Sequence, residues 1–99
     1  MSIFAGQNSV NHQKKIKEFT QLQKVYKVKL RNKCRYSSAY FAQLHTQNEW
    51  SGLKNEQEFK DEFALLCPKG IEILDTKEMK VLHRFANEYA LGSGQYPPS

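Results

Sequence analysis

The residues of this sequence that could hold a metal ion or act as a nucleophile are a few cysteines and histidines. They are Cys34, Cys67, His12, His45 and His83. A zinc site takes its ligands in close pairs, such as Cys-x-x-Cys or His-x-x-x-His, and none of these residues is spaced in that way. We therefore expect separate core or surface side chains, with no metal site and no cofactor.

Cys67 is the candidate for a cysteine nucleophile, because His83 lies one predicted helix away. Such a nucleophile needs a histidine base within reach and a third group that orients the base. The sequence does not place the two side chains together, so we favour a buried structural thiol and expect a protein that is not an enzyme. A small cysteine enzyme is kept as a rival interpretation.

The two cysteines, Cys34 and Cys67, lie far apart in the chain and make no disulfide framework. The first residues lack the charged start and apolar block of a signal peptide. Free thiols in a cytosolic protein are therefore the favoured prediction, and a disulfide between the two cysteines is the less favoured one.

One proline lies inside the chain, in the turn Cys67-Pro68-Lys69-Gly70. An X-Pro bond is the peptide bond that adopts the cis form at modest cost, and it exchanges slowly. Prolyl isomerases of the cyclophilin type act on exposed loops of this kind. A proline also ends helices routinely, and from the residues alone we favour this second role for Pro68.

The net charge is +5, and it is distributed unevenly along the chain. Residues 14–35 hold nine basic residues and one acid, Glu18, so that this segment carries +8. The rest of the chain carries −3. This asymmetry favours an acidic partner for the first half of the chain, either a nucleic acid or an acidic protein surface.

The candidate partner-binding residues lie mostly in the second half of this basic segment. They are Lys24, Lys27, Lys29, Arg31, Lys33 and Arg35. Aromatic residues alternate with the charges, as in many nucleic-acid binders, but a helix stripe that packs inward explains them better. Trp50 is a further candidate, since interface anchors favour tryptophan, and a core position is an equally good interpretation of it.

The elements that would position these residues are predicted helices. Apolar residues recur at spacings of three and four from about Asn11 to Leu30, which indicates an amphipathic helix. Val25 to Leu30 has a rival interpretation as a strand. Ser37-Ser38 could break this helix or cap the next one, and a short apolar helix follows at 39–44.

Two further helices have clear start signals. Asn55 and Asp75 are each followed three residues later by glutamate, the pattern of a helix N-terminus. The first of these helices should end at Cys67-Pro68, and the second near Gly92. Residues 71–74 between them are predicted as an extended piece or a short strand.

Together these signals predict a mostly α protein, a small single domain of three to four helices. We expect a flexible N-terminal arm over residues 1–12, a helical domain over 13–92 and a tail over 93–99. No apolar run approaches the roughly 18–20 residues needed to span a bilayer, so we expect no membrane partner.

The whole chain resembles the anti-RecBCD proteins of lambdoid phages, the family that includes the Abc pair. The resemblance covers essentially all 99 residues. It rests on the length, the basic first half, the Cys67-Pro68-Lys69-Gly70 turn and the tail over 92–99, and no diagnostic motif carries it.

This resemblance implies a non-enzymatic phage protein in the host cytoplasm that binds the helicase-nuclease RecBCD, mainly through RecC. It implies altered processing of DNA ends and altered Chi recognition, so that phage DNA survives and recombines. It also implies a host cyclophilin-type prolyl isomerase as a second partner, with Pro68 as the matching position. The rival is a small basic DNA-binding accessory protein that acts without RecBCD.

Overall fold

The computed structural model describes residues 2–97, with side chains from Lys14 onward. The described elements are α1 (Ser2–Lys29), α2 (Arg31–Cys34), α3 (Ser38–Ala42), α4 (Gln47–Ser51), α5 (Glu56–Leu66), the 3₁₀ turn η1 (Pro68–Gly70) and α6 (Thr76–Glu88). No β-strand occurs among these residues, so the prediction of a mostly helical domain is confirmed. The structure has more helices than the three to four predicted. Two of them, α2 and α4, are very short.

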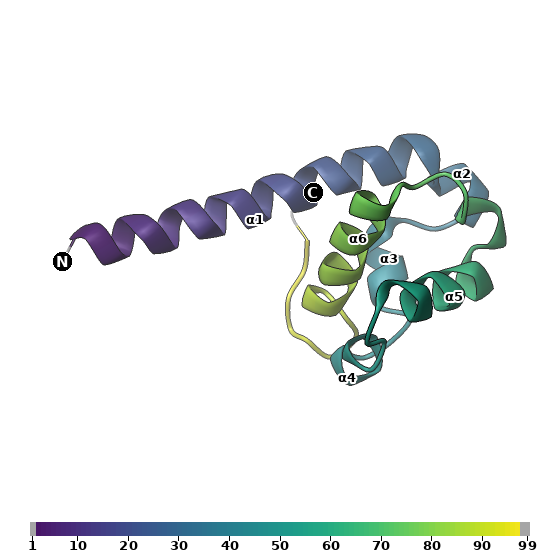
Figure 1. Cartoon of the computed structure of the whole chain (residues 1–99). Helices are drawn as coiled ribbons and strands as arrows, with labels where there is room; N and C mark the ends of the chain where they lie inside the picture. The colour runs from purple at the N-terminus through teal and green to yellow at the C-terminus, as the bar shows by residue number, and fades with distance from the viewer. Residues whose placement is uncertain (1, 98–99) are drawn as a thin grey trace.

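Helix α1 begins at Ser2, well before the predicted start near Asn11. Residues 2–12, the described part of the predicted flexible arm, are therefore helical in their backbone. The physical reason is that nothing in this segment stops a helix, since it contains no proline and only one glycine, Gly6. The N-terminal part of α1 extends beyond the other helices, whereas its C-terminal part packs on α6 and α2 (Figure 1).

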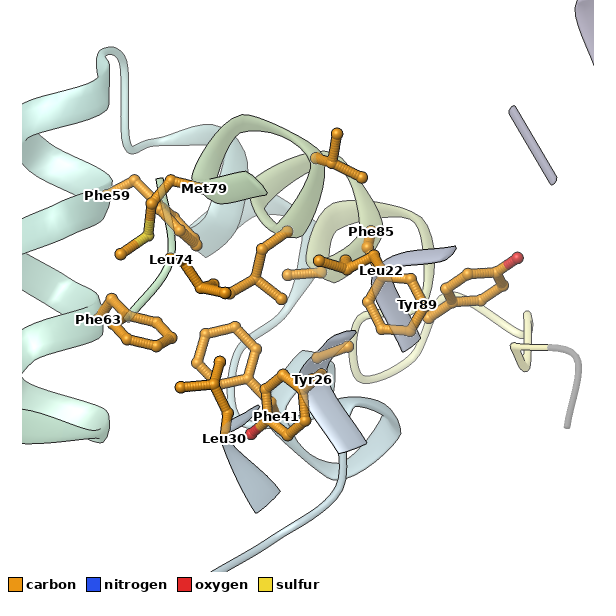
Figure 2. Close-up of a cluster of buried hydrophobic side chains, with 14 of the residues drawn as sticks. Leu22, Tyr26, Leu30, Phe41, Phe59, Phe63, Leu74, Met79, Phe85 and Tyr89 are labelled. Carbon is orange, nitrogen blue, oxygen red and sulfur yellow. The ribbon is translucent and has the colours of Figure 1, made fainter. Parts of the chain in front are cut away.

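The core forms around α6, which contacts the C-terminal part of α1 as well as α3, α4 and α5 (Figure 2). Its members with the largest fully buried side chains are Trp50, Tyr26, Phe41, Phe59, Phe63, Phe85, Leu30 and Leu82. The predicted stripe of α1 supplies Phe19 and Leu22 as well, while Ile16 at its start is 38% exposed. The helical interpretation of Val25 to Leu30 is thus correct.

The predicted caps of α5 and α6 are confirmed. The side chain of Asn55 accepts a hydrogen bond from the Glu58 N–H, and Asp75 and Glu78 form a reciprocal capping box. Ser37 caps α3 by accepting from the Tyr40 N–H. These contacts are local, which explains why the sequence predicts them.

Helix α4 is not among the helices predicted from the sequence, since the segment 45–52 is short and mostly polar. Thr46 and Glu49 form a second capping box at its start, and Thr-x-x-Glu is the sequence signal that could have revealed it. The Thr46 N–H donates to the Glu49 carboxylate and lowers the pKa of that carboxyl.

Residues 71–74 form turns rather than the predicted strand. The Ile73 N–H donates to the Gly70 carbonyl at 3.1 Å, and no neighbouring strand is described. Leu74 is buried, and Ile71 and Ile73 pack against the core. The apolar residues of this segment therefore cover the core from a turn.

The two cysteines are joined in a disulfide, Cys34–Cys67, so the prediction of free thiols is wrong. Cys34 ends α2 and Cys67 follows α5 directly, and the chain brings these two points together although they lie 33 residues apart in sequence. The bond ties α2 to the turn that contains Pro68.

Gly70 sits where a side chain would have no room. A Cβ atom on it would lie 2.8 Å from Leu30 Cδ2 and 2.9 Å from Cys67 Sγ. We therefore expect Gly70→Ala to lower the free energy of unfolding by about 1–3 kcal/mol, the usual cost of overpacking. Urea denaturation followed by circular dichroism measures this, and Gly52→Ala, at an exposed glycine, is the control.

Candidate interaction sites

In the loop predicted to bind a prolyl isomerase, only some of the four residues are exposed to solvent. Pro68 and Lys69 are exposed, whereas Cys67 and Gly70 are buried. Pro68 is the first residue of η1, and the Cys67–Pro68 peptide bond is trans. A partner that binds this loop would therefore contact the side chains of Pro68 and Lys69.

This loop, residues 67–70, is anchored at several points. The Cys67 N–H donates to the Phe63 carbonyl at 2.7 Å, and the Gly70 N–H donates to the Cys67 carbonyl at 3.0 Å. Just before the loop, the Tyr36 hydroxyl donates to the Leu66 carbonyl at 2.6 Å. Burial raises the pKa of Tyr36, which keeps this hydroxyl a donor. With the disulfide, these contacts hold Pro68 in one place.

The six predicted basic residues are all exposed, on the end of α1, on α2 and just after it. They are Lys24, Lys27, Lys29, Arg31, Lys33 and Arg35. Lys29 Nζ lies 3.9 Å from a carboxylate oxygen of Glu78, and the other five have no ion-pair partner among the described residues. Their charge is thus available to a partner.

Three of these cations gather around one hollow of about 300 Å³, which we call the basic hollow. It is lined by Thr20, Gln23, Lys24, Tyr26, Lys27, Arg31, Ser37 and Ser38. The chain places Lys24, Lys27 and Arg31 there at spacings of three and four, so that they share one side. Lys29, Lys33 and Arg35 do not line this hollow.

Trp50 is not exposed at the surface. Its prediction as a candidate interface anchor is therefore wrong. Its side chain is 0% exposed, and its Nε1–H donates to the Ala42 carbonyl at 2.8 Å. The ring centroids of Phe41 and His45 lie 5.2 and 4.8 Å from it. The core interpretation of Trp50 is correct.

Other large apolar side chains are exposed, and of these the sequence indicates only Tyr96, an aromatic residue in the tail, as an interface anchor. They are Val28, Tyr40, Leu65, Leu91 and Tyr96. Val28 and Leu65 do not lie at the apolar spacings that predict the buried sides of their helices. This position is the sequence signal that could have identified them as exposed. For Tyr40 no such signal exists, since it follows Ala39 and precedes Phe41 in an apolar run.

Cys67 and His83 are not brought together as a nucleophile and its base. Cys67 is bonded to Cys34. His83 Nε2 lies 2.7 Å from the Trp50 carbonyl, and its ring stacks on Phe59 with centroids 4.6 Å apart. Both side chains therefore have structural roles in this fold.

The residues described here form a small, mostly helical protein with an anchored proline loop and a basic surface. No family model matches the sequence, and no curated protein or solved structure matches it either. Among side chains from Lys14 to Pro97, no group of three metal-ligating residues is found, and His12 lies outside that range. None of the described helices is long and apolar enough to cross a bilayer.

Proposed function

We propose that this protein is a phage-encoded modulator that binds the host RecBCD helicase-nuclease, mainly its RecC subunit. The proposal starts from the resemblance of the whole chain to the anti-RecBCD proteins. In the host cytoplasm, binding would alter the processing of DNA ends and the recognition of Chi, so that phage DNA is protected and recombines.

One observation supports this proposal most directly, namely that the two predicted contact regions are adjacent. The disulfide joins α2, which carries Lys33 and is followed directly by Arg35, to the loop that presents Pro68. Helix α2 and η1 also contact each other directly. The elements that carry these unpaired cations and the exposed proline are therefore neighbours, which supports two partner contacts close to each other.

The first experiment is retention of purified RecBCD on the immobilised protein after nuclease treatment to remove DNA. We expect retention to persist in high salt, because a specific interface is not held by exposed charges alone. Binding that disappears without DNA would contradict the proposal and favour a plain DNA-binding protein.

Pro68→Ala tests the second partner. We expect binding to a cyclophilin-type isomerase to weaken by about ten-fold or more, which is about 1.4 kcal/mol, because the variant removes an exposed anchor of the contact. The effect on the nuclease should weaken with it. Calorimetric titration of the isomerase measures the first effect, and a Chi-dependent nuclease assay measures the second.

Pro97→Ala is the matched control, since it removes a proline from the tail and leaves the loop intact. Circular dichroism should show equal helix content in both variants, because Pro68 is exposed and lacks an N–H to lose. Normal binding of both partners by Pro68→Ala would leave Pro68 as a helix stop only.

A further inference from the structure

The basic hollow has two walls of different chemistry. One wall comes from α1 and the start of α2, and it carries Lys24, Lys27 and Arg31. The other comes from the segment before and at the start of α3, and it contains Ser37 and Ser38. Three cations and two serines thus line one opening.

This combination of groups fits an oxyanion. The three cations have no carboxylate partner among the described residues, so nothing neutralises them in the free protein. Arginine and lysine donate charge-assisted hydrogen bonds to phosphate oxygens, and serine hydroxyls commonly add neutral ones. A carboxylate ligand would fit the charges, but the volume of about 300 Å³ holds a larger group and lies at the lower end of ligand pockets.

Tyr26, one of the residues that line the hollow, also carries a hydroxyl without a hydrogen-bond partner. It lines the hollow, it is 1% exposed, and its hydroxyl is the one buried side-chain polar atom in the described part of the chain without a hydrogen-bond partner. Burial raises the pKa of this phenol, with a smaller contribution from Tyr36, so it remains a donor. Such an unmade hydrogen bond calls for a ligand oxygen or a water.

An exposed aromatic side chain lies on α3, close in the chain to the two serines. Tyr40 is 59% exposed, and its N–H donates to the Ser37 hydroxyl at 3.2 Å, so it stands one helical turn from the hollow. An exposed ring next to a phosphate site offers a stacking surface to a base that is not paired. This arrangement favours a single strand over a duplex or an acidic protein.

We propose that the basic hollow binds a phosphate group of a single-stranded nucleic acid, with Tyr40 stacking on a neighbouring base. This inference goes beyond the proposed function, because it needs neither RecBCD nor the isomerase. It assigns Lys24, Lys27 and Arg31 to a strand and leaves Lys33 and Arg35 to a protein partner.

The test compares two variants that lose the same charge. Lys27→Gln/Arg31→Gln changes the hollow, whereas Lys54→Gln/Lys60→Gln changes exposed lysines outside it. The probe is a dye-labelled 12-nucleotide DNA strand without terminal phosphates, titrated by anisotropy at several salt concentrations. We expect the first variant to lose about ten-fold in affinity, with a salt slope shallower by about 0.7 for each lost phosphate contact. The control should change less than two-fold.

Further variants distinguish binding in the hollow from non-specific binding by the net positive charge. Ser38→Ala and Tyr26→Phe keep the net charge and should each weaken strand binding several-fold, and Tyr40→Ala should do the same. Equal losses in the two charge variants, or no loss in the neutral ones, would overturn the proposal. So would tighter binding of poly-glutamate than of the strand, which would assign the cations to an acidic protein.

Inorganic phosphate and a nucleoside monophosphate identify the source of the phosphate. In a nuclear magnetic resonance titration of the full chain, the strand should shift the amides of Ser37 and Ser38 at lower concentration than either small anion. Shifts by inorganic phosphate with no binding of the strand would contradict a nucleic-acid ligand.

Discussion

Replacing Trp50 with alanine is expected to lower the free energy of unfolding by about 3–5 kcal/mol, the range for removing a fully buried large aromatic side chain. Trp50 is 0% exposed and touches aromatic rings from three segments, with Phe41 at 5.2 Å and Phe59 at 6.0 Å between centroids. The change opens a cavity in the middle of this cluster. It also leaves the Ala42 carbonyl without its indole donor, and a buried acceptor without a partner adds to the cost.

Urea denaturation followed by circular dichroism measures the loss. For a domain whose total stability is about 5–15 kcal/mol, the variant would lose a third or more of its stability in most of this range. Trp50→Phe is the matched control, since it keeps an aromatic ring and removes the indole N–H, and it should cost distinctly less. A loss below about 1 kcal/mol in Trp50→Ala, as expected for a surface substitution, would contradict the buried position of this side chain.

Reducing the Cys34–Cys67 bond is expected to lower the free energy of unfolding by about 3–4 kcal/mol, because the bond closes a loop of this length in the unfolded chain. The two cysteines are 33 residues apart in sequence. Both are buried, at 7% and 1% exposed, so the reduced thiols would still pack between α2 and the Pro68 loop. The expected result is a native fold of lower stability.

Denaturation of the wild-type protein with and without dithiothreitol measures this effect. Cys34→Ala/Cys67→Ala is the control, since its stability should not respond to the reductant. Two thiols that react with an alkylating agent in the native protein without reductant would contradict the bond. A cytoplasm keeps protein thiols reduced, so alkylation in intact cells followed by mass spectrometry would show which form occurs there.

The helices that the sequence predicted well are those whose ends are defined by local contacts. Asn55 and Asp75 cap α5 and α6 through residues three positions away, and Pro68 ends α5 as predicted. The disulfide depends instead on how α2 packs against η1, and no local spacing contains that information. Composition alone favoured the wrong prediction for it.

For the basic hollow, the sequence predicts the kind of residue involved but not which of the basic residues lie together. The uneven charge identified Lys24, Lys27 and Arg31, but it did not separate them from Lys33 and Arg35. The basic hollow also needs Ser37 and Ser38 from a different segment, and only the packed structure brings them to the same opening as the cations. Trp50 was ambiguous because a lone tryptophan suits a core and an interface equally well.

The buried position of Trp50 also gives the protein its own optical reporter. It is the only tryptophan of the chain, and it sits in a dry environment between rings and next to His45. Its emission should lie at short wavelength in the native state and shift to the red when the core opens. The Trp50 carbonyl contacts His83 on α6, so we expect the emission to change when that helix moves. Partner binding that rearranges α6 is therefore visible without any label.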